Sequence, residues 1–183
     1  MHPRTQELID YLGETRATLR GVVDDVPIEA RERPPSPGRW SVAGVLEHLG
    51  IVETAVTMLL RERTAAARAD GIPADDDVSS ILATIDPGRT TDRRRRITTA
   101  PEMQPAMTMS VDEAWRALDE TRRGVLEAVR LTDGLAIGTI VHPHPALGPL
   151  TLYEWIAFVG AHELRHAEQI REVARELGAA ESS

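Results

Sequence analysis

Four segments of the chain repeat apolar residues at the three- and four-residue spacing of a helix with one buried face. In the first segment the pattern runs from a candidate cap at Thr5 to Pro27, which stops a helix. Its apolar positions are Leu8, Leu12, Leu19, Val22 and Val26. Because this spacing puts the side chains on one stripe, the segment predicts a helix that packs against a core.

The second segment opens at Trp40-Ser41 and ends near Asp70-Gly71. Ser41 is a preferred N-cap residue, and Trp40 can pack on the first turn as a hydrophobic staple. The inward positions that follow are Val45, Leu49, Val52, Val56 and Leu59 or Leu60. A second helix is therefore predicted.

Two further segments begin with capping boxes, in which a Ser or Thr and a Glu three residues later bond each other's backbone N–H. The sequence SVDE at 110 to 113 opens a helix that stops before Thr132, and TLYE at 151 to 154 opens the last helix. Leu150 and Trp155 occupy the two staple positions of this last helix, which makes its start the best marked in the chain.

Two irregular connections set the class of fold. Residues 70 to 109, about forty in number, are rich in Asp, Pro, Thr and Arg, with a short helix expected around Val78 to Ile85. The stretch HPHPALGP at 142 to 149 precedes the last helix. We find no convincing strand pair. The sequence predicts one all-α domain over residues 1–183, a four-helix bundle with long crossover connections.

Composition argues against several classes of function. A net charge of -8 and a pI near 5.3 argue against a nucleic-acid binder, because phosphate contacts need a positive field. The run Arg93 to Arg96 has no aromatic neighbours and is interpreted as a solvated loop. No stretch reaches the ~18 uninterrupted apolar residues of a membrane span, and the N-terminus does not resemble a signal peptide. We expect no membrane partner and a cytoplasmic location.

The chain contains no Cys, so it supplies no disulfide, no Cys-ligated metal and no thiol nucleophile of its own. Three of its six histidines fall on inward helix faces. His162 and His166 lie one turn apart on the apolar stripe of the last helix, and His48 lies between apolar positions of the second. A lone buried histidine usually bonds a carbonyl or carboxylate, but two at i and i+4 can ligate one ion at ~2.0 to 2.1 Å. The pair favours metal ligation over core packing.

Residues 162 to 166, HELRH, match the H-E-x-x-H signature of zinc metalloproteases. In better-known families the third ligand lies downstream, but residues 167 to 183 contain no His, so the inward candidate is His48 upstream. Glu163 is offset by about 100° from His162 and could be a base at the site rim. We favour instead a solvent-facing Glu163 paired with a basic residue. The signature is therefore weak evidence for proteolysis.

Two stretches carry a resemblance to a known family. RWSVAGVLEHL at 39 to 49 is similar to a W-S-x-x-x-x-L-x-H-L helix opening. HPALGPLTLYEWIAFVGAHELRHAEQI at 144 to 170 is similar to H-P-x-x-G-x-L-T-x-x-E-W followed by H-x-x-x-H-x-x-Q-I. These patterns, with the helix layout, resemble the DinB-like, also called YfiT-like, metalloproteins over nearly the whole chain. One departure is Gly44, where many members carry a longer polar residue.

The resemblance implies a four-helix bundle with a long crossover and a divalent metal held by His48, His162 and His166. It also implies thiol-linked chemistry, since several members are transferases or isomerases that use bacillithiol, mycothiol or glutathione. We hypothesise a transferase in which a low-molecular-weight thiol binds at an open metal position and attacks a small-molecule substrate. Glu163 or His144 would move protons. All-histidine ligands suit Zn, Ni, Fe or Cu.

Two alternatives stay open at this point: a metal-dependent hydrolase, and a non-enzymatic bundle or homodimer that binds a metal or ligand. We expect no proteolysis, because a peptide substrate often pairs with an exposed strand edge and the sequence offers no convincing strand. The walls of the substrate pocket are expected to come largely from residues 70 to 109.

Overall fold

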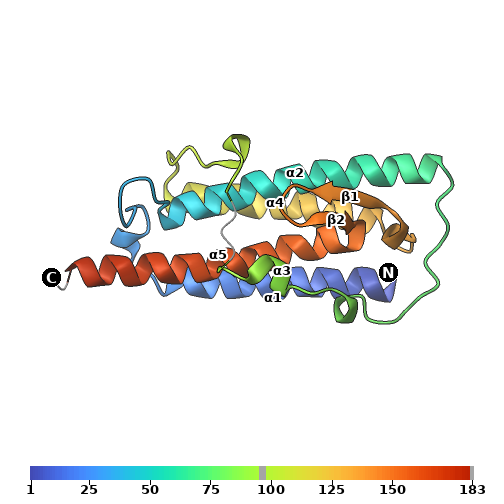
Figure 1. Ribbon diagram of the computed structural model, residues 1–183, viewed down its shortest axis with the longest axis horizontal. Coiled ribbons are helices and arrows are strands. Elements are labelled where there is room, and N and C mark those ends of the chain that lie inside the picture. Colours follow the sequence, from blue (N-terminus) through green and yellow to red (C-terminus); the bar gives the residue numbers. More distant parts are fainter. Residues whose placement is uncertain (95–97, 182–183) are drawn as a thin grey trace.

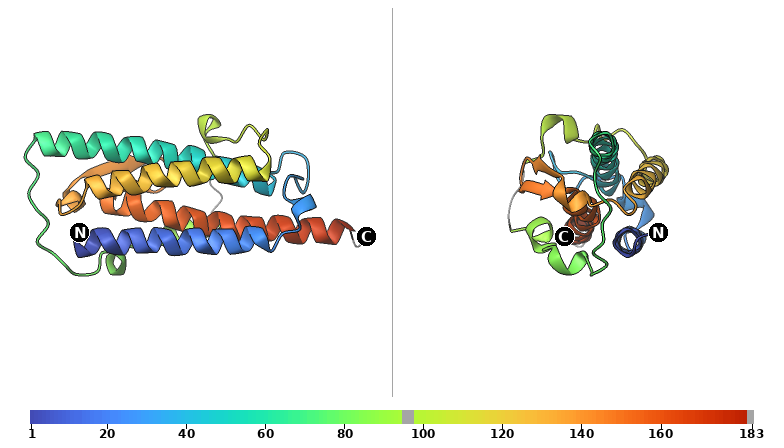
Figure 2. Two further views of the ribbon diagram at one scale, coloured as in Figure 1. Left: turned by 180° about the vertical axis from the view of Figure 1, so that it is seen from behind. Right: turned by 90° about the vertical axis from the view of Figure 1, so that its right-hand side faces the viewer.

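The computed structural model describes residues 1–94 and 98–181, and long helices dominate this part of the chain (Figure 1). Four of them pack side by side as a bundle, seen end-on in Figure 2. They are α1 (Pro3–Asp24), α2 (Val42–Ala69), α4 (Val111–Leu131) and α5 (Leu152–Glu181). The predicted all-α four-helix bundle is confirmed.

The helix starts follow the local chemistry of the sequence. The Ser41 hydroxyl accepts from the Gly44 amide at the start of α2, and Ser110 forms the predicted capping box with Glu113 in α4. At α5, the Thr151 amide donates to Glu154 and the Glu154 amide donates to the Thr151 hydroxyl. Each of these bonds satisfies an N–H that the helix itself leaves unpaired.

The start of α1 differs from the prediction. Its N-cap is His2, whose ring accepts from the Arg4 amide, and Thr5 lies buried inside the first turn. Pro3 has no N–H to leave unpaired and a fixed φ suited to a helix, so it starts α1 two residues before the expected cap.

One long crossover is explained by the helix directions. Figures 1 and 2 show α2 and α4 running the same way, opposite to α1 and α5. The chain must therefore return along the bundle between α2 and α4. Within this connection, the helix expected over 78 to 85 is reduced to one 3-10 turn at Leu82–Thr84, and the short α3 (Gly88–Thr91) and another turn (Pro101–Met103) follow.

The expectation that no convincing strand pair is present is wrong. β1 (Val141–His144) and β2 (Gly148–Thr151) form an antiparallel hairpin with His144 paired to Gly148. Each strand has four residues and contains a proline, so the alternating pattern is too short to detect. The hairpin gains its stability by packing on α5, where Leu150 is buried and the Trp155 indole donates to the His142 carbonyl.

Two buried apolar clusters fill the bundle, one that includes Trp155 and Phe158 and one that includes Leu46 and Trp115. By length and composition alone, α2 is also apolar enough to cross a membrane. It is nevertheless a core helix of this bundle, and more than half of its most apolar stretch is buried inside the protein. Such helices pass the same compositional test as membrane spans.

Candidate metal centre

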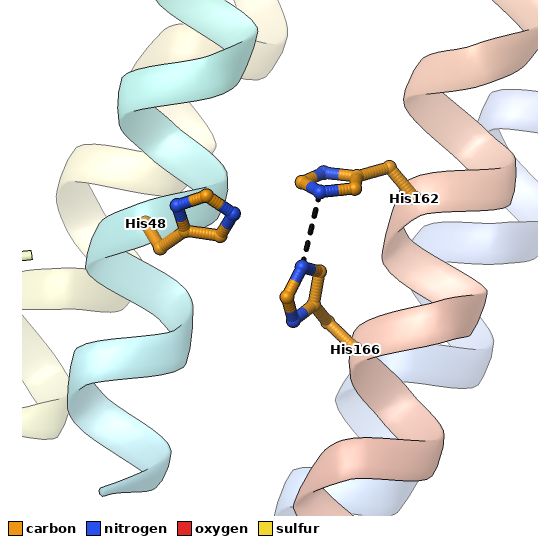
Figure 3. A group of neighbouring side chains, drawn as sticks. All are labelled: His48, His162 and His166. Atoms are coloured by element: carbon orange, nitrogen blue, oxygen red, sulfur yellow. Dashed lines mark hydrogen bonds between the residues drawn. The ribbon is translucent and has the colours of Figure 1, made fainter. Parts of the chain in front are cut away.

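His48 from α2 and His162 and His166 from α5 converge on one point. Their candidate ligand atoms all lie within 4.8 Å of one another, and the His162 and His166 Nε2 atoms are 3.0 Å apart. Figure 3 shows the three rings turned toward each other across the gap between the two helices. The prediction that His48 lies within reach of the H-x-x-x-H pair is confirmed, although 114 residues (162 − 48) separate it from His162.

Hydrogen bonds behind two of the rings fix which nitrogen faces the centre. His48 Nδ1 lies 2.7 Å from the Met103 carbonyl oxygen, and His166 Nδ1 lies 2.8 Å from the Gln169 side-chain oxygen. Both oxygens accept, so each Nδ1 carries the proton and each Nε2 keeps its lone pair. This is how proteins commonly orient metal-ligating histidines.

The surroundings keep the three rings neutral. His48 and His166 are buried, and His162 is partly buried and lines the adjoining cleft. Burial holds the pKa of His162 and of His166 well below the ordinary value, and it also lowers the pKa of His48. A neutral imidazole is the form that binds a metal, so the cluster presents ligands without first losing protons.

This donor set fits a divalent ion. Two nitrogens bound at ~2.1 Å to one ion and about 90° apart are separated by ~3.0 Å, which matches the observed spacing of His162 and His166. The buried triad could hold a metal ion. Three imidazoles are too few to close the coordination of such an ion, and the cleft that all three rings line would give a further ligand access to it.

The cleft beside the triad has a volume of about 750 Å³. Aromatic and aliphatic side chains make most of its wall, and its charged lining residues within the described chain are Arg39, Arg93 and Arg165. As expected, residues of the long connection contribute, namely Thr90, Arg93, Thr98, Thr99, Ala100, Met103 and Gln104. The expectation was incomplete, however, because the hairpin residues 142 to 147 form another wall.

Glu163 lies outside this cleft. Its side chain has no exposed surface, and its carboxylate binds Arg16 at 2.6 Å and Arg122 at 2.9 Å, with the Thr15 hydroxyl as a further donor. The expected basic partner is present, but a solvent-facing position is wrong. A base at the site rim is not supported either, because both carboxylate oxygens are already bonded inside the bundle.

His144 lines the cleft, with its ring against Trp155 and Phe158. Its Nδ1 accepts the backbone amides of Ala146 and Leu147 at 3.1 and 3.2 Å. The proton of the neutral ring therefore sits on Nε2, and burial lowers the pKa of His144, which favours that neutral form. His144 is arranged to donate a hydrogen bond rather than to accept a proton.

Two other histidines stay out of the triad. His2 caps α1, and His142 lines the cleft while its carbonyl accepts from Trp155. Sequence reasoning did not assign a role at the triad to several residues that touch it. Gln169 and the Met103 carbonyl bond His166 and His48, the Trp40 ring lies 4.8 Å from that of His48, and the Phe158 ring stacks on His162. The i+3 spacing of Gln169 from His166 was a usable signal. The contact of Trp40 depended on how α2 begins.

The arginine run is only partly the solvated loop that we expected. Arg93 binds both carboxylate oxygens of Glu172 and lines the cleft, whereas Arg94 is exposed and pairs with Asp92. Arg95 and Arg96 lie outside the described residues. The polar context of the run did not reveal that Arg93 faces α5.

Gly44 has a structural reason to lack a side chain. A Cβ built at this position would come within 2.1 Å of the Met107 sulfur, which packs against the first turn of α2. The space that a longer polar side chain would need at position 44 is thus occupied by Met107. The Ser41 hydroxyl caps the first turn of α2 by accepting from the Gly44 amide.

Comparison with known proteins agrees with this architecture. The family model of the DinB superfamily matches residues 11–170. The uncharacterized protein YuaE of Bacillus subtilis (strain 168) is 27% identical over 165 residues, or 90% of this chain and 93% of that protein. The crystal structure of TT2238, a four-helix bundle protein, matches with a TM-score of 0.60 at 19% identity, covering 92% of this chain and 98% of that one. At that identity the structural match shows the fold alone. The family model spans most of the chain, and the protein therefore belongs to the DinB superfamily.

Proposed function

We propose that this protein is a metal-dependent transferase that joins a low-molecular-weight thiol to a small electrophilic molecule. One observation carries the proposal: a neutral histidine triad opens into a cleft large enough for two small molecules. The chain has no Cys, so the thiol must come from outside.

His48, His162 and His166 would hold the divalent ion, with Met103 and Gln169 keeping two of the rings in the ligating tautomer. A divalent ion bound there supplies Lewis acidity, which favours the thiolate form of a thiol over the thiol. Trp155 and Phe158 form an apolar wall that limits water around the reacting groups.

His144 has a different task from the one first hypothesised. Its Nε2–H would donate to an oxygen of the electrophile as negative charge develops there, in the way that a preorganised donor stabilises an oxyanion. The thiol S–H bond breaks as the S–C bond forms, its proton goes to solvent at the open side of the cleft, and the oxyanion takes up a proton from the same solvent to give the adduct. Glu163 takes no part in this scheme because its carboxylate is held by Arg16 and Arg122.

A hydrolase is the second candidate, and the openness of the same cleft to solvent favours it. Water would then take the place of the thiol, and the same triad and donor would serve. Peptides are poor candidates as substrates. The hairpin does offer short strand edges, so the argument against proteolysis now rests on Glu163, which cannot act as the base of a zinc protease from inside the bundle.

The test is a matched set of incubations. Protein purified without a metal-affinity tag is first analysed for bound metal, then supplied with bacillithiol, mycothiol or glutathione and a chromogenic alkylating electrophile. Product that needs both the thiol and the metal supports the transferase. Electrophile consumption that is metal-dependent but thiol-independent supports the hydrolase instead. Chelator-sensitive cleavage of casein that is lost in Glu163→Gln would overturn both.

The proposal includes a cytoplasmic location, because the cytosol keeps low-molecular-weight thiols reduced. It leaves the metal open among Zn, Ni, Fe and Cu, which all accept imidazole ligands. The elemental analysis above decides between them.

A further inference from the structure

A second polar cluster lies in the middle of the bundle and consists of four charged side chains, one from each long helix. Arg16 comes from α1, Glu53 from α2, Arg122 from α4 and Glu163 from α5. We call these four residues the charge cluster. Its formal charge is zero, and its carboxylates are almost completely buried, at 2% and 0% exposure.

Each arginine in the charge cluster contacts both glutamates. Arg16 lies 2.9 Å from Glu53 and 2.6 Å from Glu163, and Arg122 lies 2.6 Å from Glu53 and 2.9 Å from Glu163. Opposite charges thus alternate around a closed ring. Moving any one helix breaks two of these contacts.

Groups that lie next to the charge cluster in space form further hydrogen bonds with its side chains. The Thr121 hydroxyl donates to Glu53, Arg122 donates to the Leu12 carbonyl, and Arg16 donates to Asp119. Thr15 gives Glu163 one further donor. Nothing in this set has a free position for a ligand, so its role is internal to the bundle.

The charge cluster and the histidine triad share two helices. Glu163 follows His162 directly, at about 100° around α5, and Glu53 follows His48 by five residues, at about 140° around α2. The end-on view in Figure 2 places α1 and α4 on one side of α2 and α5, and the hairpin on the other. The same two helices are therefore bonded through charges on one side and supply metal ligands on the other.

Apolar contacts between helices allow small sliding movements, whereas a buried charge separated from its partner is costly. We propose that the charge cluster fixes the register of α2 against α5, so that His48 meets His162 and His166 at ligating distance. Its four members are positioning residues for the metal centre. This inference rests on the metal site of the proposed function and is independent of the thiol reaction.

The test replaces the whole charge cluster with apolar residues of similar length: Arg16→Met, Glu53→Leu, Arg122→Met and Glu163→Leu together. No charge is left unpaired, and the Thr15 and Thr121 hydroxyls keep bonds to the carbonyls of Leu12 and Leu118. Metal-free protein is titrated with Co²⁺, and affinity and the visible d–d spectrum are recorded, with folding checked by circular dichroism.

We expect the quadruple variant to stay helical and to bind Co²⁺ at least ~10-fold more weakly, with an altered d–d spectrum. A stability role alone would not change either quantity in folded protein. Unchanged affinity and spectrum would overturn the positioning role. If the wild type itself bound no Co²⁺, both the metal site and this inference would fall.

A single variant decides the case if the quadruple variant does not fold. Glu163→Gln keeps the shape of the side chain and removes one charge, and Val129→Ala is the control because it truncates a buried α4 side chain without changing a charge. With both variants folded, we expect Co²⁺ affinity to fall at least ~3-fold in Glu163→Gln and to stay unchanged in Val129→Ala. Equal affinities in the two variants would overturn the inference.

Discussion

The histidine triad and the charge cluster are two polar groups in one bundle, and they satisfy their hydrogen-bonding capacity in opposite ways. In the charge cluster, guanidinium groups and hydroxyls from the protein itself bond both carboxylates. In the triad, His48 and His166 use Nδ1 for a protein partner and direct Nε2 at the other rings.

The difference separates a structural cluster from a functional one. Buried polar groups in native proteins are almost always bonded, so a group complete within the chain needs nothing further. In the triad, the Nε2 atoms of His162 and His166 lie 3.0 Å apart and bond each other, and a bound ion would replace that bond with two ligand bonds. The H-E-x-x-H signature contains residues of both clusters, because His162 and His166 belong to the triad while Glu163 belongs to the charge cluster.

Breaking the charge cluster should have the largest effect on stability. Arg122→Met leaves two buried carboxylates with Arg16 as their remaining cationic partner, which should lower the free energy of unfolding by about 3–5 kcal/mol. Urea unfolding of the metal-free protein measures this. Arg61→Met, at an exposed pair with Glu127, is the control and should change stability by less than ~1 kcal/mol. A similar small loss in Arg122→Met would show that the cluster is not energetically coupled.

Breaking the triad should have its largest effect on metal binding instead. His166→Ala or His162→Ala removes one of three ligands, so bound metal should fall to near zero and affinity by at least ~100-fold. His142→Ala, in the hairpin, should keep full metal content. Elemental analysis after dialysis reports both. Full metal content in the two α5 variants would remove that helix from the site.

The histidine triad should also make the metal-free protein sensitive to acid. The pKa values of His48, His162 and His166 lie below that of an unfolded histidine, ~6.5, so the unfolded chain binds more protons. The stability of the metal-free protein is thus fully present above pH ~6.5 and is lost as pH falls through the folded-state pKa values. The slope should approach ~1.4 kcal/mol per pH unit for each extra proton bound.

Thermal unfolding between pH 7.5 and 5 measures this loss. The double variant His162→Gln with His166→Gln should show a shallower decline, because two of the responsible rings are gone. An equal slope in the double variant would assign the acid sensitivity to other groups.

The smallest effect on metal binding should come from Gln169, which bonds the ring of the metal-ligand candidate His166. Gln169→Ala removes the acceptor of the His166 Nδ1 proton, so metal affinity should fall about 10-fold while the fold is retained. Competition with a chromophoric chelator measures the change. Gln6→Ala, at an exposed site on α1, is the matched control. Equal affinities would show that the ring of His166 needs no such support.

Much of the fold was predictable because it is encoded locally. The Ser110–Glu113 and Thr151–Glu154 boxes involve residues three apart, and helical spacing placed His162 and His166 on one stripe. The hairpin was not predictable, since its strands are short and are held by Trp155 and α5. The cap of α1 was misplaced because Pro3 outweighed the better-known cap signal of Thr5.

The sequence by itself determined the helices, the inward face of each candidate ligand and the absence of a protein thiol. All three follow from residue types and from spacings within one helix. Only the tertiary structure decided that Glu163 faces Arg16 and Arg122, that His144 donates through Nε2, and that His48 reaches the α5 pair. The reason is that a side chain's angle around its own helix is a local property. Its partner depends on how four helices pack, which contacts distant in the chain determine.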